Sequence, residues 1–200
     1  MAADIAGRLG DSYTVWSKGY SYDREKTIGG RYIDKQVDIC ICRKDMPLAG
    51  IAVKFVMQNY SQNSNNYFEN MLGETANIRC KGYPYFHIFI ILDKLPYYDR
   101  YKNIKGWETF SDHNISKYAV LSSDDARAFY HTPDKTLLYV VHLPEPECEL
   151  NTAQEYLDYY RTGNHTLSLT EHNYEEFAGN VILNDYDTFI DKVYHTVKAL

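Results

Sequence analysis

The stretch 85–92, YFHIFIIL, is the feature that most restricts how this chain can fold. It is apolar almost throughout, interrupted by His87, and it is far shorter than the roughly 20 residues that a membrane-spanning helix needs. A short continuous apolar run is typical of a central β-strand that is covered on both faces. We therefore expect a sheet with helices on its two sides, which makes the chain a mixed α/β protein.

The rest of the sequence supplies further strands and helices. Alternation predicts a strand over 36–42 (QVDICIC), and the apolar run 50–57 (GIAVKFVM) predicts a second strand close enough to form a hairpin with it. A third run, 136–143 (TLLYVVHL), predicts another strand. Helical spacing of apolar residues predicts helices over 3–19 (one or two short ones), 22–29, 66–79, 115–125, 153–161, 171–177 and 186–199.

Length and composition fit one domain. The 200 residues, of which 44% are hydrophobic, are enough to bury a core without disulfides or a structural metal. We expect a single domain over 1–200, with its core at about 22–143 and accessory helices over 150–200.

Charge and cysteine content narrow the function classes. The net charge of −6 excludes an indiscriminate nucleic-acid coat, which needs clustered Lys and Arg, but it does not exclude a nuclease with local positive charge at a groove. Cys40 and Cys42 lie two residues apart and are expected on one face of a strand, as buried thiols in a reducing compartment. Since residues 1–9 lack an apolar signal core, we expect a cytoplasmic protein without a membrane partner.

Asp38 and Lys54 lie in the first two predicted strands, sixteen residues apart. A charge inside an apolar strand needs a partner or a wet cleft. Metal-assisted phosphodiester hydrolysis needs carboxylates that hold a divalent cation, and a lysine can orient the attacking water or offset developing charge. The alternative is an ordinary surface ion pair, which contributes about 0–1 kcal/mol.

Over roughly residues 22–93, this order of elements resembles the PD-(D/E)XK nuclease superfamily, which includes most type II restriction endonucleases. Residues 37–39 (VDI) match the first part of the family pattern, and residues 52–54 (AVK) match the acid-x-Lys triplet in spacing. The resemblance implies a restriction-endonuclease-like mixed sheet flanked by helices. It also implies Mg²⁺ or Mn²⁺ as cofactor, double-stranded DNA as substrate, a homodimer, and a place inside a prokaryotic cell.

The same resemblance assigns roles to single residues. Asp38 and position 52 would bind the metal ion, with Val53 between the matched positions 52 and 54 also at the metal site, and Lys54 would position the water. Glu25 stands about where the family often has a glutamate on the preceding helix.

Position 52 departs from the pattern, because it is Ala52 where the family has Glu or Asp. Three explanations stay open. The chain is an inactivated variant, or the acid has moved to Glu69 or, as second candidate, Glu74, or the domain is a non-catalytic nucleic-acid-binding module on a nuclease scaffold. An unrelated α/β domain with an incidental Asp/Lys pair is a further alternative.

Side chains that suit DNA contact follow the second predicted strand. Amide side chains can pair with adenine or donate to phosphates, but they also cap helices, and here a helix is expected to begin near residue 64. Basic residues after the helix, and basic residues mixed with aromatic ones over 94–107, can grip a backbone and stack on bases or form a solvated loop. The DNA-binding candidates are Gln58, Asn59, Gln62, Asn63, Asn65, Asn66, Arg79 and Lys81.

Overall fold

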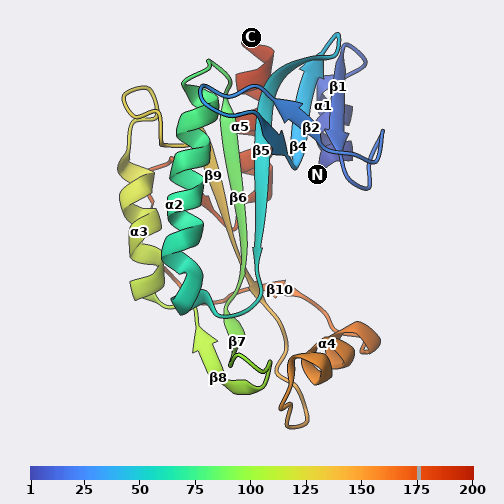
Figure 1. Cartoon of the computed structure of the whole chain (residues 1–200), viewed down its shortest axis with the longest axis vertical. Helices are drawn as coiled ribbons and strands as arrows, with labels where there is room; N and C mark the ends of the chain where they lie inside the picture. The colour runs from blue at the N-terminus through green and yellow to red at the C-terminus, as the bar shows by residue number, and fades with distance from the viewer. Residues whose placement is uncertain (175–176) are drawn as a thin grey trace.

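The computed structural model describes residues 1–174 and 177–200. Among these residues it contains five helices and a curled, mixed sheet of seven strands (Figure 1). The mixed α/β class predicted from the sequence is therefore confirmed. None of the helices in the described part of the chain is long and apolar enough to cross a membrane.

The centre of the sheet is parallel, and its flanks contain antiparallel pairs and one further parallel pair. Strand β6 (Tyr85–Leu92) pairs in parallel with β5 (Met46–Val56) and with β9 (Lys135–His142). On one side β4 (Ile39–Arg43) pairs antiparallel with β5, and β1 (Tyr13–Ser17) pairs antiparallel with β4. On the other side β9 pairs with the short strands β10 (Ser168–Leu169) and β11 (Val181–Leu183).

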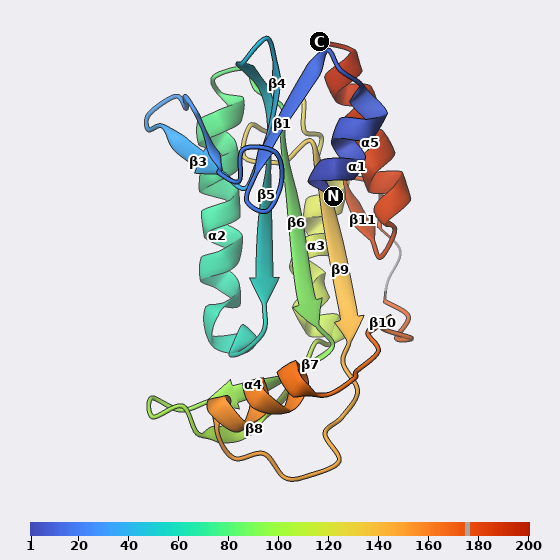
Figure 2. The ribbon, with the colours of Figure 1, turned by 90° about the vertical axis from the view of Figure 1, so that its right-hand side faces the viewer.

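Helices cover both faces of this sheet, as the run 85–92 predicted. Helices α1 (Ala2–Leu9) and α5 (Tyr186–Lys198) pack on one face, and α2 (Tyr60–Arg79) and α3 (Asp112–Ser123) pack on the other (Figure 2). Strand β6 alternates between the two cores: Phe86 packs with Phe189 of α5, while Phe89 packs with Tyr118 of α3. Burial on both faces explains why that strand carries almost no polar residue.

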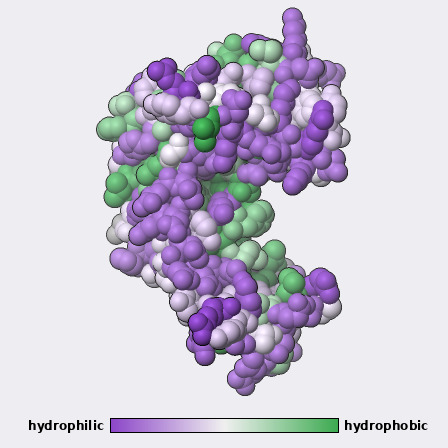
Figure 3. All heavy atoms as spheres, viewed as in Figure 1, coloured by the Kyte–Doolittle hydropathy of each residue, from purple (hydrophilic) through white to green (hydrophobic). Residues whose placement is uncertain are grey.

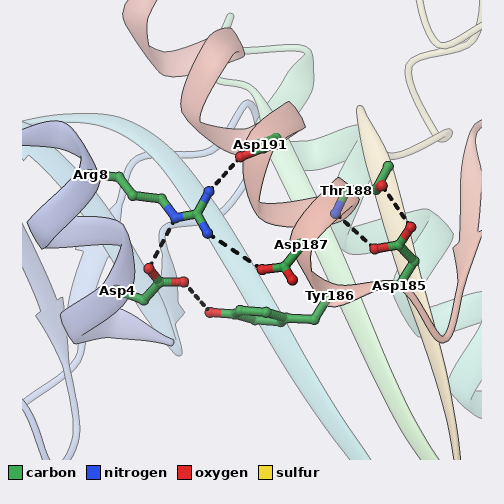
Figure 4. A network of polar contacts seen from close by, with 7 residues as sticks. All are labelled: Asp4, Arg8, Asp185, Tyr186, Asp187, Thr188 and Asp191. Carbon is green, nitrogen blue, oxygen red and sulfur yellow. Dashed lines mark hydrogen bonds and ion pairs between the residues drawn. The ribbon is translucent and has the colours of Figure 1, made fainter.

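The two ends of the chain meet on the α1/α5 face (Figure 4). The Arg8 guanidinium of α1 bonds to Asp4 at 3.0 Å and also to Asp187 and Asp191 of α5, and the Tyr186 hydroxyl donates to Asp4 at 2.9 Å. The hydrogen bond from Arg8 lowers the pKa of Asp4. Because these side chains are partly exposed, the network contributes little to the free energy of unfolding, but it orients α1 and α5 relative to each other.

Two smaller units stand outside the main sheet. Strands β2 (Lys26–Ile28) and β3 (Lys35–Val37) form a two-stranded ribbon beside β4 and β5. Strands β7 (Lys94–Tyr98) and β8 (Ile104–Thr109) form a hairpin that, with α4 (Ala153–Thr162), makes the unit we call the hairpin lobe. The space-filling view shows a deep notch between this lobe and the upper part of the molecule (Figure 3).

Several predicted elements agree with the structure to within a few residues. They are the strands over 85–92 and 136–143 and the helices over 115–125, 153–161 and 186–199. The helix predicted over 66–79 is longer, since α2 begins at Tyr60. The reason is that Asn59, in the left-handed conformation before the helix, is held by hydrogen bonds to Tyr98 of the hairpin.

Other predictions were wrong. The second half of 3–19 is strand β1, and 22–29 forms turns followed by β2 instead of a helix, because Ile28 is fully buried while Ser21 and Asp23 adopt positive φ angles that end regular structure. The predicted strand 36–42 is divided by a bend at Asp38. Of the helix predicted over 171–177, residues 175 and 176 lie outside the described residues, and 171–174 and 177 are not helical.

Asn77 of α2 holds the loop between β2 and β3. Its side-chain oxygen accepts from the amides of Tyr32 (2.9 Å) and Ile33 (3.3 Å), and its amide donates to the carbonyl of Ile33 at 2.8 Å. The contact is so close that a Cβ at Gly30 would lie 2.1 Å from the Asn77 nitrogen. This loop leads directly into β3 and the bend at Asp38, so Asn77 fixes both.

We predict that Asn77→Ala lowers the free energy of unfolding by about 1–3 kcal/mol, because partly buried backbone amides lose their partner. Urea denaturation followed by circular dichroism measures this change. The matched control is Asn66→Ala, an exposed residue of the same helix, for which a change within about 0.5 kcal/mol is expected. Equal effects of the two variants would contradict the role given to Asn77.

Candidate functional site

Strands β4 and β5 separate at a point that we call the fork. They pair between residues 39–43 and 46–51, and the chain before Ile39 turns away into β3. At the bend, Oδ2 of Asp38 accepts the backbone N–H of Val53 at 2.7 Å. The carboxylate thus takes the place that a carbonyl of a paired strand would occupy, which satisfies an amide at the open edge of β5.

The fork opens into a pocket of about 630 Å³ between β3, β5 and α2. Six of the candidate residues line it: Asp38, Ala52, Val53, Lys54, Glu69 and Glu74. Its walls also include Lys35, Gln36, Tyr67, Asn70, Asn77 and His87. Residues from two predicted strands and from the helix that follows them are therefore brought together in one open space.

Asp38 and Lys54 face the same side of the sheet. Lys54 pairs with Phe89 and Ala52 with His87 in the register of β5 and β6, and Phe89 belongs to the core under α2 and α3. The ammonium of Lys54 lies 4.6 Å from the centre of the Tyr67 ring, a cation–π contact that holds the side chain over the pocket. Because Lys54 is exposed, this contact leaves it accessible to a ligand.

The two glutamates of α2 differ in their surroundings. Glu74 is occupied: it forms an ion pair with Lys35 at 2.7 Å and accepts the hydroxyl of Tyr85. Glu69 is exposed and has no hydrogen bond or ion pair with any residue in the described part of the chain. Glu69 is thus the better placed of the two to meet a ligand.

His87 forms the floor next to Ala52. It is the partner of Ala52 across β5 and β6, is 4% exposed, and bonds through Nε2 to the Thr75 hydroxyl at 3.1 Å. Burial, with a smaller contribution from the charge of Lys35, lowers the pKa of His87 to about 3. The imidazole is therefore neutral at physiological pH, and position 52 itself offers a methyl group where the family pattern has a carboxylate.

Glu25 is not among the residues that line the pocket. It lies in the loop before β2 and approaches Lys18 at 3.8 Å. The predicted helix that would have carried it toward the site does not form.

The amide cluster divides into two groups. Asn59 bonds to Tyr98 and Gln62, Asn63 donates to the carbonyl of Asn59, and Asn65 accepts from Lys117. These four side chains, Asn59, Gln62, Asn63 and Asn65, therefore serve the start of α2 and its packing. Gln58 and Asn66 are exposed and have no side-chain hydrogen bond within the described residues.

The two basic candidates after the helix also differ. The Arg79 guanidinium is engaged inside the protein, where it donates to the carbonyls of Phe129 and Thr132 and pairs with Asp134 at 3.0 Å. Arg79 is thus a structural residue in this conformation, while Lys81 is exposed.

The resemblance implies a bound Mg²⁺ or Mn²⁺ ion, so the side chains that could coordinate such an ion need to be considered. Within residues 1–174 and 177–200, no three His, Cys, Asp or Glu side chains are close enough together to form a metal-binding group. Mg²⁺ does not need such a group, since it usually keeps several waters and uses one or two carboxylates with substrate phosphates. Asp38 and Glu69, which line one pocket, fit that pattern.

The low pKa of His87 predicts a pH-dependent stability. Burial of the neutral ring makes its protonation in the folded state unfavourable. The contribution of His87 to the free energy of unfolding is therefore complete above about pH 6.5 and is lost as pH falls toward about 3. Between about pH 7.5 and about pH 4.5, His87 should account for about 2–3 kcal/mol of the decrease in the free energy of unfolding. Urea denaturation at both pH values should show a smaller loss in His87→Gln. The control, exposed His113→Gln, should keep the wild-type loss, and an unchanged loss in His87→Gln would refute the prediction.

Comparison with known proteins gives no relative: no family model, curated protein or solved structure matches the chain.

Proposed function

We propose that this chain is a Mg²⁺-dependent endodeoxyribonuclease of the type II restriction enzyme kind, built on a restriction-endonuclease-like fold. One observation carries the proposal: Asp38, Lys54 and Glu69 line a single open pocket at the fork between β4 and β5. A carboxylate and a lysine at the point where two strands part, with a helix opposite, suit the binding of a cation, a phosphate and a water.

Each residue has a distinct role. Asp38 uses one carboxylate oxygen for the Val53 amide, which fixes its orientation and leaves the other oxygen for a ligand. Glu69 would supply the second carboxylate, and Lys54 would orient the attacking water and offset the charge that develops on the phosphate. A bound Mg²⁺ would polarise the phosphate and lower the pKa of water.

The position of Glu69 supports the explanation that the acid has moved to α2. Glu74, the other candidate, is already neutralised by Lys35. Ala52 also lines the pocket, so a longer acidic side chain at position 52 would enter the same space, as the inactivated-variant explanation requires.

We propose double-stranded DNA as the substrate. The notch between the hairpin lobe and the upper part of the molecule opens on the α1/α5 side of the sheet, on the right in Figure 3, whereas the pocket at the fork lies beside α2. Exposed Gln58 and Asn66 lie at the two sides of the start of α2, where they are available for base or phosphate contacts. We propose a homodimer that matches the two-fold symmetry of duplex DNA.

A second candidate function is a non-catalytic nucleic-acid-binding module. Ala52, which offers a methyl group where the family pattern has a carboxylate, favours it. Such a module would bind nucleic acid, as the proposed nuclease does, but would not cleave it.

We predict that the chain cuts supercoiled plasmid DNA with Mg²⁺, and that EDTA abolishes cutting. Glu69→Gln and Lys54→Met should each lower the rate by about 100-fold or more, because each removes a group that stabilises the transition state. Gel analysis of nicked and linear products measures the rates. Matched controls are Glu171→Gln and Lys192→Met, exposed residues distant in sequence from the fork, which should cut as the wild type does.

Substitution at position 52 separates the explanations. If the wild-type chain binds DNA without cutting and Ala52→Glu restores Mg²⁺-dependent cutting, the chain is an inactivated enzyme. If it binds DNA and neither form cuts, the binding module is correct. Absence of DNA binding at low salt, measured by fluorescence anisotropy, would contradict both.

A further inference from the structure

A second pocket, of about 400 Å³, lies in the hairpin lobe between the β7–β8 hairpin, α4 and the segment 143–151. We call it the hairpin pocket. It shares no lining residue with the pocket at the fork, and its volume is within the range of small-molecule sites. The residues that matter for its chemistry are Lys105, Trp107, Cys148, Asn151, Tyr156 and Tyr160.

Aromatic rings form the wall of the hairpin pocket. The ring centres of Trp107 and Tyr156 are 6.0 Å apart, and those of Tyr156 and Tyr160 are 4.7 Å apart. Trp107 is 39% exposed, and the ammonium of Lys94 lies 5.8 Å from the centre of its ring. An exposed indole beside two phenol rings is suited to stacking against a flat ring of a ligand.

The hydroxyl of Tyr156 is a polar group of this wall. The residue is 8% exposed, and its hydroxyl, which forms no hydrogen bond with any residue in the described part of the chain, keeps contact with solvent. Tyr160, its neighbour, instead donates to the carbonyl of Pro144 at 2.6 Å. Burial, and secondarily the nearby Tyr160, raises the pKa of Tyr156, so its hydroxyl stays a neutral donor that a ligand can use.

The remaining polar groups suit a ring edge better than an anion. Lys94 is neutralised by Glu145 in an ion pair, Lys105 approaches Asp99 at 3.9 Å, and no arginine or histidine lines the pocket within the described residues. The side-chain amide of Asn151 has no partner among the described residues, and it can donate to and accept from a base edge at once. A flat heterocycle with polar groups at its edge would fit the aromatic wall, the hydroxyl of Tyr156 and the amide of Asn151.

We propose that the hairpin pocket binds a single unpaired nucleobase, stacked on Trp107 and held at its edge by the hydroxyl of Tyr156 and the amide of Asn151. Enzymes that read a base outside the duplex use the same combination of aromatic stacking and edge hydrogen bonds. This inference rests on the proposed function for the source of the base, a DNA strand lying in the notch. The same chemistry would also accept a free nucleotide.

Tryptophan fluorescence tests the proposal directly. The chain has two tryptophans, and Trp16 is 8% exposed, so a ligand-dependent change should report Trp107. Titration with dAMP, dGMP, dCMP and TMP, and with a short single-stranded oligodeoxynucleotide, should quench the emission. Because Trp107→Phe removes the reporter, ligand binding by this variant is followed by alkylation of Cys148, which the ligand should no longer slow. Tyr156→Phe should weaken binding about fivefold through loss of one hydrogen bond. Tyr101→Phe, an exposed residue in the turn of the same hairpin, should bind normally.

Thiol labelling gives a second readout with an internal control. Cys148 lines the hairpin pocket and Cys80 lies at the end of α2, and both are exposed free thiols. Bound nucleotide or oligonucleotide should slow alkylation of Cys148, followed by peptide mass spectrometry, and leave Cys80 unchanged. This readout does not depend on a correctly folded Trp107 variant.

The outcomes separate this proposal from the proposed nuclease function. Quenching by the oligonucleotide alone places the base in a strand, and quenching by mononucleotides as well assigns recognition to the base itself; both support the pocket. Protection of Cys148 that is unchanged in Trp107→Phe, or no response of either readout to any of these ligands, overturns it. Asp38→Asn, which should stop cleavage, should leave both readouts unchanged, so failure of cleavage does not imply failure of base binding.

Discussion

The hydrogen bond from the Val53 amide to the Asp38 carboxylate is the contact on which the fork depends. Strand β4 leaves β5 at this point, and an unpaired, partly buried amide would cost about 1–3 kcal/mol. The carboxylate satisfies that amide while its chain turns into β3. One residue thus both opens the sheet and points a carboxylate into the opening. Since the side chain is held by the main chain of β5, its position relative to Lys54, one residue further on, is set by the strand geometry itself.

The features that could be predicted from the sequence are those decided by burial and strand period. The run 85–92 was predicted to be a central strand, and residues 38, 52 and 54 were assigned to two neighbouring strands; the structure places all three around one pocket. The bend at Asp38 could not be predicted, because it depends on a hydrogen bond to a residue in the next strand. The early start of α2 was missed for the same reason, since Asn59 is held by Tyr98, thirty-nine residues away.

Candidate contacts with DNA show a similar limit. An amide-rich or basic segment has the same composition whether its side chains face a ligand or the protein, and the tertiary partner decides between the two. Arg79 forms an ion pair with Asp134 and donates hydrogen bonds to two carbonyls in the segment before β9. The side chain of Asn65 accepts a hydrogen bond from Lys117 of α3. Gln58, Asn66 and Lys81 have no such partner among the described residues and stay exposed. The sequence did not decide whether the aromatic and basic segment 94–107 forms a binding surface or a solvated loop. In the structure part of this segment lines a pocket together with α4.

The proposed function requires an acidic chain to bind an anionic substrate, and the charges at the fork bear on this requirement. Lys35 is paired with Glu74, so the formal charges left in the pocket at pH 7 are those of Asp38, Glu69 and Lys54, one more negative than positive. Such a pocket repels a phosphate. A divalent cation between the two carboxylates would reverse the sign and make the same surface attract it. Binding of substrate at the fork would then require the cation first, and the chain as a whole, at net charge −6, would have little affinity for DNA elsewhere on its surface.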